Sequence, residues 1–163
     1  NFLAIDDIPV SDEGEALDES SVIRLPRDID LPRIPAFEPK GEDPFVQRVR
    51  ASGKRWIVFT DENNEPLLVL DSNAFLRAVL EGTKTKINAY AYCHRPIVVR
   101  DPAMRLGEAI TQLTVEAQIE EDDVIDRDLI LVWSDEKRVI SGADLLGRLL
   151  RGIVKRKPLT GDG

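Results

Sequence analysis

The sequence predicts an α/β fold in which two similar halves follow an extended acidic leader. Three observations support this prediction: an internal repeat, apolar spacings of helices that alternate with short strands, and an uneven distribution of charge. The chain has 163 residues, which is enough for one domain or two small ones. Each half alone is too small to bury its faces well, so we expect the two halves to pack together.

The acidic leader is predicted over residues 1–33. Residues 1–30 hold nine carboxylates and two arginines, a balance of −7, whereas residues 31–163 carry 20 basic and 21 acidic side chains. Prolines and scattered acids in this segment follow neither a helical nor a strand period, so we predict extended chain. The chain begins with Asn1 rather than methionine, and we expect it to be part of a longer protein.

The internal repeat defines the two halves. Residues 69–82 align with residues 139–152 at an offset of 70, with apolar residues at equivalent core positions. Each half is predicted to contain, in order, an extended segment, a helix, a strand, a turn, a second strand and a closing helix. Residues 58–62 align with 132–136 at an offset of 74. At an offset of 61, residues 35–37 align with 96–98 and residues 45–49 with 106–110. The resulting boundaries are 34–82 for the first half, 83–94 for a linker, 95–153 for the second half and 154–163 for a basic, then flexible, tail.

Apolar spacing predicts the individual elements. Residues 106, 109, 110 and 113 are apolar at i, i+3, i+4 and i+7, which indicates a helix. Residues 56–59 and 67–70 are short β-rich runs separated by Asp, Asn and Pro, which indicates a hairpin. The two closing helices have apolar stripes, and we expect them to end at Gly82 and Gly152. These stripes are Phe75, Leu76, Val79 and Leu80 in the first half, and Leu145, Leu146, Leu149 and Leu150 in the second.

Four motifs of the second half occur together: Pro96-Ile-Val-Val-Arg-Asp-Pro, Leu106-Gly-Glu-Ala-Ile, the apolar run 129–133, and Arg138-Val-Ile-Ser-Gly-Ala-Asp-Leu-Leu. In this combination the half resembles a CBS domain, and the repeat resembles the tandem pair called a Bateman module. The resemblance extends over residues 33–153 and is weaker in the first half. It implies two pseudo-symmetric α/β repeats with clefts between them, a regulatory role without catalysis, and an adenine nucleotide (AMP or ATP) or a related compound as ligand.

Ser141 and Asp144 have two interpretations. Ser-x-x-Asp at a helix start is a capping box, in which each side chain binds the other residue's backbone N–H. The resemblance implies instead that Asp144 accepts the ribose hydroxyls while Ser141 and the free amides face a phosphate. It also places Pro96 and Ile97 beside the ligand. Arg138 stands where the family usually has glycine, so that its side chain either fills the adenine pocket or binds a phosphate.

The first half differs at the two positions that matter most. Asp71 replaces the hydroxyl residue and Ala74 replaces the acid. We therefore expect this cleft to bind ribose poorly, and the whole chain to bind one nucleotide.

Other site types are disfavoured. The insert at 114–128 contains seven carboxylates but lacks the glycine and spacing of a calcium-binding loop, so we expect a solvated acidic loop and no metal. Its alternating Val115, Ala117 and Ile119 suggest an extra strand. Cys93 is the chain's lone cysteine, which excludes an internal disulfide, and we expect it to be buried rather than paired with His94 in catalysis. With no nucleophile beside a base, we expect no enzyme.

Partners and location follow from charge and hydropathy. No basic surface suited to nucleic acid is present beyond the final helix, whose cations suit its dipole. No apolar run reaches the roughly 18 residues of a membrane span. The apolar closing helices predict a homodimer. Residues 1–7 resemble the segment after the membrane domain in CBS-bearing magnesium and cobalt efflux proteins, which implies a cytoplasmic position at a membrane and a parent transport domain as partner.

Overall fold

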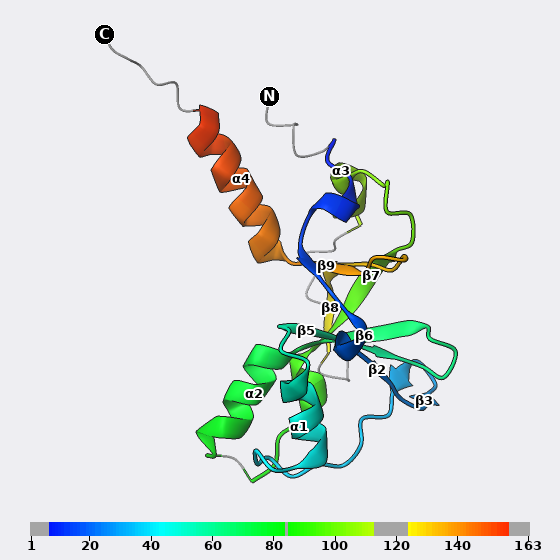
Figure 1. Cartoon of the computed structure of the whole chain (residues 1–163), viewed down its shortest axis with the longest axis vertical. Helices are drawn as coiled ribbons and strands as arrows, with labels where there is room; N and C mark the ends of the chain where they lie inside the picture. Colours follow the sequence, from blue (N-terminus) through cyan, green and yellow to red (C-terminus); the bar gives the residue numbers. More distant parts are fainter. Residues whose placement is uncertain (1–6, 84, 113–123, 157–163) are drawn as a thin grey trace.

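A curled seven-stranded sheet runs through the molecule, in the order β1-β9-β8-β7-β6-β5-β2 (Figure 1). The computed structural model describes residues 7–83, 85–112 and 124–156. Within them, the sheet strands are β1 (Glu15–Ala16), β2 (Val22–Arg24), β5 (Trp56–Thr60), β6 (Pro66–Asp71), β7 (Cys93–Val99), β8 (Ile125–Val132) and β9 (Arg138–Ile140). A separate hairpin consists of β3 (Arg27–Asp28) and β4 (Leu31–Pro32). The α-helices are α1 (Pro44–Ala51), α2 (Ser72–Glu81), α3 (Leu106–Ile110) and α4 (Gly142–Arg156).

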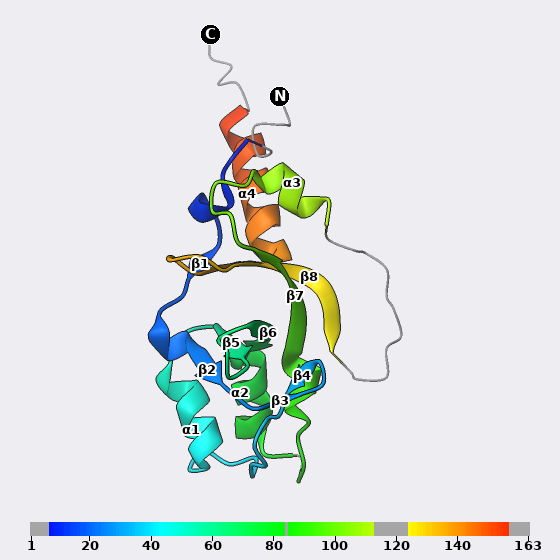
Figure 2. The same cartoon turned by 90° about the vertical axis from the view of Figure 1, so that its right-hand side faces the viewer.

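The helices lie at opposite ends of the molecule. Helices α1 and α2 pack at one end, and α3 and α4 lie at the other, with the long strands β7 and β8 between them (Figures 1 and 2). The α/β class predicted from the sequence is therefore confirmed. No helix among the described residues is long and apolar enough to cross a membrane.

Alternation along the strands divides the core into three clusters. Ile57 and Phe59 of β5 face α1 and α2, whereas Trp56 and Val58 of the same strand face the opposite side. This follows from the two-residue period of a strand. A second cluster joins α3 to β7, β8 and β9, and the third lies between the two ends of the molecule. The third cluster contains Trp56, Val58, Val69, Leu129, Leu131, Trp133 and Val139. The two helical ends are thus joined by a buried apolar layer.

Strand pairing around the hairpins matches the sequence expectation. Strands β5 and β6 pair antiparallel, as do β8 and β9. Helix α2 ends at Gly82, which has the left-handed conformation (φ 63°). The helix starting at Leu106 is also present, but it ends at Ile110 and so is shorter than the spacing to residue 113 predicted.

Two element predictions are wrong. Helix α4 does not end at Gly152 but continues to Arg156. An internal glycine costs a helix about 1 kcal/mol without forbidding it. The predicted equivalence of residues 35–37 with residues 96–98 is also wrong. Residues 96–98 belong to β7, whereas residues 35–37 lie outside the strands, and the strand that pairs in parallel with β5 is β2, from the predicted leader.

The leader contributes to the fold between Ile8 and Pro32. Strand β1 pairs with β9 at one edge of the sheet, and β2 pairs with β5 at the other. Val10 is completely buried in the cluster around α3. Its N–H donates to the carbonyl oxygen of Met104 at 2.9 Å. This part of the chain alternates short strands with two 3₁₀ turns, at Val10–Asp12 and Glu19–Ser21, so it is only partly extended, and it is an integral part of the sheet.

Candidate functional site

Ser141 and Asp144 form the N-terminal cap of α4. The Ser141 N–H donates to Asp144 Oδ2 at 2.9 Å, and the Asp144 N–H donates to Ser141 Oγ at 3.2 Å. The Ser141 hydroxyl also donates to Asp144 Oδ2, at 3.0 Å. These bonds make a complete capping box.

The cap leaves acceptor capacity on Asp144. All its hydrogen bonds within the described chain go to Oδ2, so Oδ1 has no partner there. Asp144 is half-buried, whereas Ser141 is 5 % exposed. An ionised carboxylate has about four lone-pair sites, so one group can serve both the cap and an external hydroxyl donor.

The sheet brings the other predicted residues toward the same end of the second half. Ile97 pairs with Ile130, and Ile130 pairs with Ile140, the residue before Ser141. Ile97 is buried, and its side chain packs in the cluster around α3 with Ile140. Pro96 is half-buried and lies where the register between β7 and β8 shifts. Ile97 therefore forms part of the floor beneath this end of the sheet rather than an exposed wall.

Arg138 has a partner that the sequence did not suggest. Its Nε donates to the carbonyl oxygen of Glu13 at 2.7 Å, and its Nη2 donates to the carbonyl oxygen of Gly14 at 2.9 Å. Arg138 therefore fastens the leader to β9. Neither of the two roles predicted for this side chain, filling an adenine pocket or binding a phosphate, is needed to explain its position.

Glu13 and Arg148 adjoin the site and were missed as a pair. Arg148 Nε donates to Glu13 Oε2 at 2.6 Å, and the side chain of Glu13 is only 7 % exposed. Arg148 lies four residues after Asp144, on the same face of α4. The two partners are 135 residues apart, so no local sequence pattern could link them. The only signal in the sequence was that Arg148 is a cation of the final helix.

The first half has a cap of a different kind. Asp71 Oδ1 accepts from the Ala74 N–H at 3.1 Å, and Arg55 lies 3.7 Å from Asp71 Oδ2. The side chain of Ala74 has no oxygen that could accept a hydrogen bond from the Asp71 N–H or from a ribose. The two halves therefore differ at this position, as expected.

Cys93 and His94 point to opposite sides of β7. Cys93 is fully buried in the cluster beneath α1 and α2, and burial raises the pKa of its thiol. His94 Nδ1 lies 2.8 Å from Asp128 Oδ1 on β8 and packs edge-on against Trp56. The prediction that Cys93 is a buried apolar residue is confirmed.

Most of the acidic insert, including Val115, Ala117 and Ile119, lies outside the described residues. Among the residues described, no cluster of three or more potential metal ligands occurs. Comparison with protein-family models, with curated proteins and with solved structures finds no match to this chain.

Proposed function

We propose that the chain is a non-catalytic regulatory module, a tandem pair of CBS-like repeats that senses an adenine nucleotide. The order of elements supports this proposal. In one half, β2 and β5 are parallel, β5 and β6 antiparallel, and α1 and α2 follow β2 and β6. In the other, β7 and β8 are parallel, β8 and β9 antiparallel, and α3 and α4 follow β7 and β9.

The connections between the halves are also equivalent. The start of β7 pairs antiparallel with β6, through His94 opposite Val69. In the same way β1 pairs antiparallel with β9, through Glu15 opposite Val139. The segment β1–β2 thus corresponds to the single strand β7, interrupted by residues 17–21. The β1–β2 segment therefore pairs with β9 and β5, just as β7 pairs with β6 and β8, so each pairs with a strand of both halves. This equivalence supports a pseudo-symmetric pair.

The observation that carries the ligand proposal is the half-buried Asp144 with Oδ1 free of described partners. It stands at the start of a 15-residue helix, beside the buried Ser141. A carboxylate fixed in this way suits the two hydroxyls of a ribose, and the helix start favours an anion. Arg148, already oriented by Glu13, has further N–H groups for a phosphate. The first half, with Asp71 and Ala74, stays empty in this proposal.

Thermal unfolding with AMP, ADP, ATP with magnesium, and S-adenosylmethionine tests the proposal. A ligand at one hundred times its dissociation constant adds about 2.7 kcal/mol to the free energy of unfolding. For a chain of this size this raises Tm by about 5–10 °C. Asp144→Ala removes the shift and, through the lost cap, lowers the unliganded stability by about 1 kcal/mol. Asp144→Asn keeps the shape but loses one strong acceptor, and we expect an intermediate shift.

The parent context is part of the same proposal. We place the module at the cytoplasmic face of a membrane, where it controls a transport domain of a longer chain. The resemblance of residues 1–7 to the start of such modules supports this. Thermal shift of the isolated module tests ligand sensing independently of that context.

A structural dimerisation module is the alternative, and a specific observation favours it. Leu146, Leu149 and Leu150 on α4 are 56 %, 40 % and 52 % exposed, and Leu80 on α2 is 64 % exposed. Leucines at i, i+3 and i+4 make one continuous apolar stripe, which typically marks an interface. We expect sedimentation to show a homodimer at micromolar concentration, and Leu149→Glu to yield a monomer. Arg151→Glu, at an exposed position about 200° around α4 from Leu149, is the matched control. A monomeric unmodified protein contradicts this alternative.

A further inference from the structure

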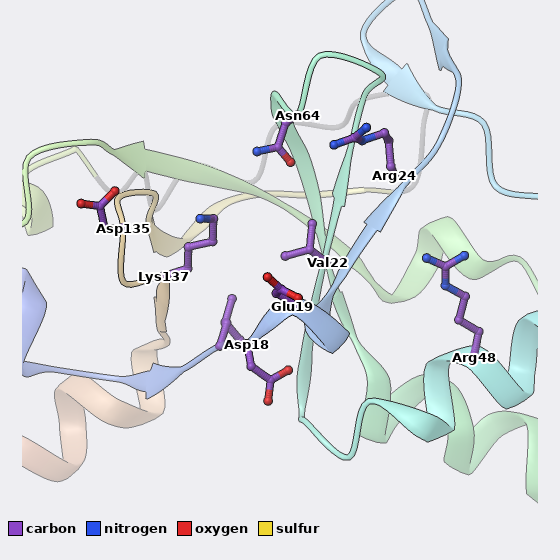
Figure 3. A pocket seen from close by; sticks show the side chains of 9 residues that line it. Asp18, Glu19, Val22, Arg24, Arg48, Asn64, Asp135 and Lys137 are labelled. Atoms are coloured by element: carbon purple, nitrogen blue, oxygen red, sulfur yellow. The ribbon is translucent and has the colours of Figure 1, made fainter.

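A groove lies at the opposite end of the β5–β6 and β8–β9 hairpins from Ser141 and Asp144. We call it the hairpin groove: it has a volume of about 640 Å³ and is bounded by η3 (Glu19–Ser21), β2, α1 and the turns of both hairpins (Figure 3). Small-molecule sites typically have volumes of 300–1,000 Å³. Lys137 and Ser141 stand at opposite ends of β9, four residues and therefore about 13 Å apart. The hairpin groove is thus separate from the nucleotide site proposed above.

Three cations from distant parts of the sequence line this groove: Arg24, Arg48 and Lys137. Figure 3 shows the ends of Arg24 and Lys137 facing the space beside Asn64, with Arg48 further along on α1. The guanidinium groups of Arg24 and Arg48 have no hydrogen-bond or ion-pair partner among the described residues. Unpaired guanidinium groups that share a concave surface are suited to phosphate, which they bind through two parallel N–H···O bonds.

Lys137 is held in place with donors to spare. Its ammonium donates to the carbonyl oxygen of Ser134 at 3.2 Å and lies 4.7 Å from the centre of the Trp133 ring. An ammonium group has three donors, so two remain. Asn64, in the turn between β5 and β6, has the left-handed conformation (φ 62°), and its side-chain amide faces the groove.

The acidic residues of the groove do not neutralise these cations by direct pairing. Asp18 accepts from the Ser20 hydroxyl and, at 3.0 Å, from the Ser20 N–H, and these bonds hold the pKa of Asp18 below its usual range. Glu19 and Asp135 pair with no cation of the described chain. The lining thus has three charges of each sign, whereas the whole chain has a net charge of −8. The lining therefore has no net charge to repel an anion, and the attraction comes from the guanidinium groups of Arg24 and Arg48, which have no partner in the described chain.

We propose that the hairpin groove binds a small phosphate-bearing molecule, with its phosphates held by Arg24, Arg48 and Lys137. The carboxylates of Glu19 and Asp135 then face the ligand's hydroxyl groups or a magnesium ion that it carries, since hard cations prefer oxygen ligands. The ligand bridges the two halves, because Arg24 and Arg48 belong to one and Lys137 to the other. Binding of the ligand therefore stabilises the packing of the two halves, which the apolar layer of the third cluster already joins.

Inorganic pyrophosphate is the probe, because it has no ribose and does not need Asp144. We expect isothermal titration calorimetry to show one pyrophosphate per chain, and Arg24→Gln or Arg48→Gln to raise its Kd at least tenfold. Arg50→Gln, on the same turn of α1 but outside the groove, is the matched control and leaves Kd unchanged. Asp144→Ala also leaves it unchanged.

Two results would overturn this inference. One is the absence of pyrophosphate binding to the unmodified protein; the other is an equal loss of binding in Arg50→Gln and Arg48→Gln, which marks non-specific attraction. Circular dichroism of each variant verifies folding, and the substituted arginines are exposed. Failure here leaves the nucleotide proposal intact, because that proposal uses Ser141, Asp144 and Arg148, none of which lines the hairpin groove.

Discussion

Gly14→Ala tests whether the leader is an integral part of the fold. Gly14 has a φ of 79°, and a Cβ added there would lie 2.2 Å from the Val139 carbonyl oxygen and 2.9 Å from Ile140 Cγ1. The left-handed conformation costs a residue with a Cβ about 1–2 kcal/mol. The nearest atom is backbone of β9 and cannot turn aside as a side chain does, so β1 must move away.

Displacement of β1 from β9 would break hydrogen bonds whose typical energies are known. It separates Arg138 from the carbonyl oxygens of Glu13 and Gly14, and it strains the ion pair between Glu13 and Arg148. A hydrogen bond to a charged group contributes about 1.5–3 kcal/mol. Adding one such bond to the backbone strain, we expect Gly14→Ala to lower the free energy of unfolding by about 2.5–5 kcal/mol, measured by urea denaturation.

Gly53→Ala is the matched control. Gly53 has a similar φ of 64°, but no atom lies within 4 Å of the added Cβ. Only the backbone strain of about 1–2 kcal/mol remains. Equal losses in the two variants would refute the close packing of the leader on β9.

Three further predictions concern stability. Ile29→Gly raises the free energy of unfolding by about 1 kcal/mol in urea denaturation, because Ile29 is a β-branched residue with a φ of 59° and is 89 % exposed. Val10→Ala lowers it by about 2 kcal/mol, since it removes two buried carbons from the cluster around α3. Urea midpoints fall as the pH drops below about 4, because the Glu65 and Asn63 N–H groups hold the pKa of Asp61 below its usual range in the folded state. Because the pKa is lowered by folding, ionised Asp61 stabilises the folded state above about pH 4, and this contribution is lost on acidification. An Asp61→Asn variant whose urea midpoint has the same pH dependence as that of the unmodified protein would contradict this prediction.

Local patterns predicted much of the fold but not its long-range pairings. The hairpin of β5 and β6 and the helix α2 followed from strand composition, turn residues and a C-terminal glycine. The strand β2 was missed because three residues between acids and prolines have too little pattern, and only the parallel pairing with β5 makes them a strand. The predicted end of α4 at Gly152 was wrong because the preference of glycine for a helix end is weak. The helix continues through Gly152 to Arg156.

The candidate site shows the same division. Ser141 and Asp144 were identified from their spacing, but the cap and a ribose site require the same residue types, so sequence could not separate them. The roles of Arg138 and Glu13 depend on a contact between β9 and a segment more than 120 residues earlier. Such a contact leaves no trace in local spacing. That Oδ1 of Asp144 has no partner among the described residues is likewise a property of the folded geometry.

Calorimetric titration of AMP into three proteins tests the central claim most directly. The proteins are the unmodified chain, Asp144→Ala and Asp71→Ala; the last removes the cap of α2, the equivalent helix in the other half. The account predicts one AMP per chain, a Kd raised at least tenfold by Asp144→Ala, and a Kd unchanged by Asp71→Ala. AMP binding that is indifferent to Asp144→Ala, or an unmodified protein that does not bind AMP, would contradict it.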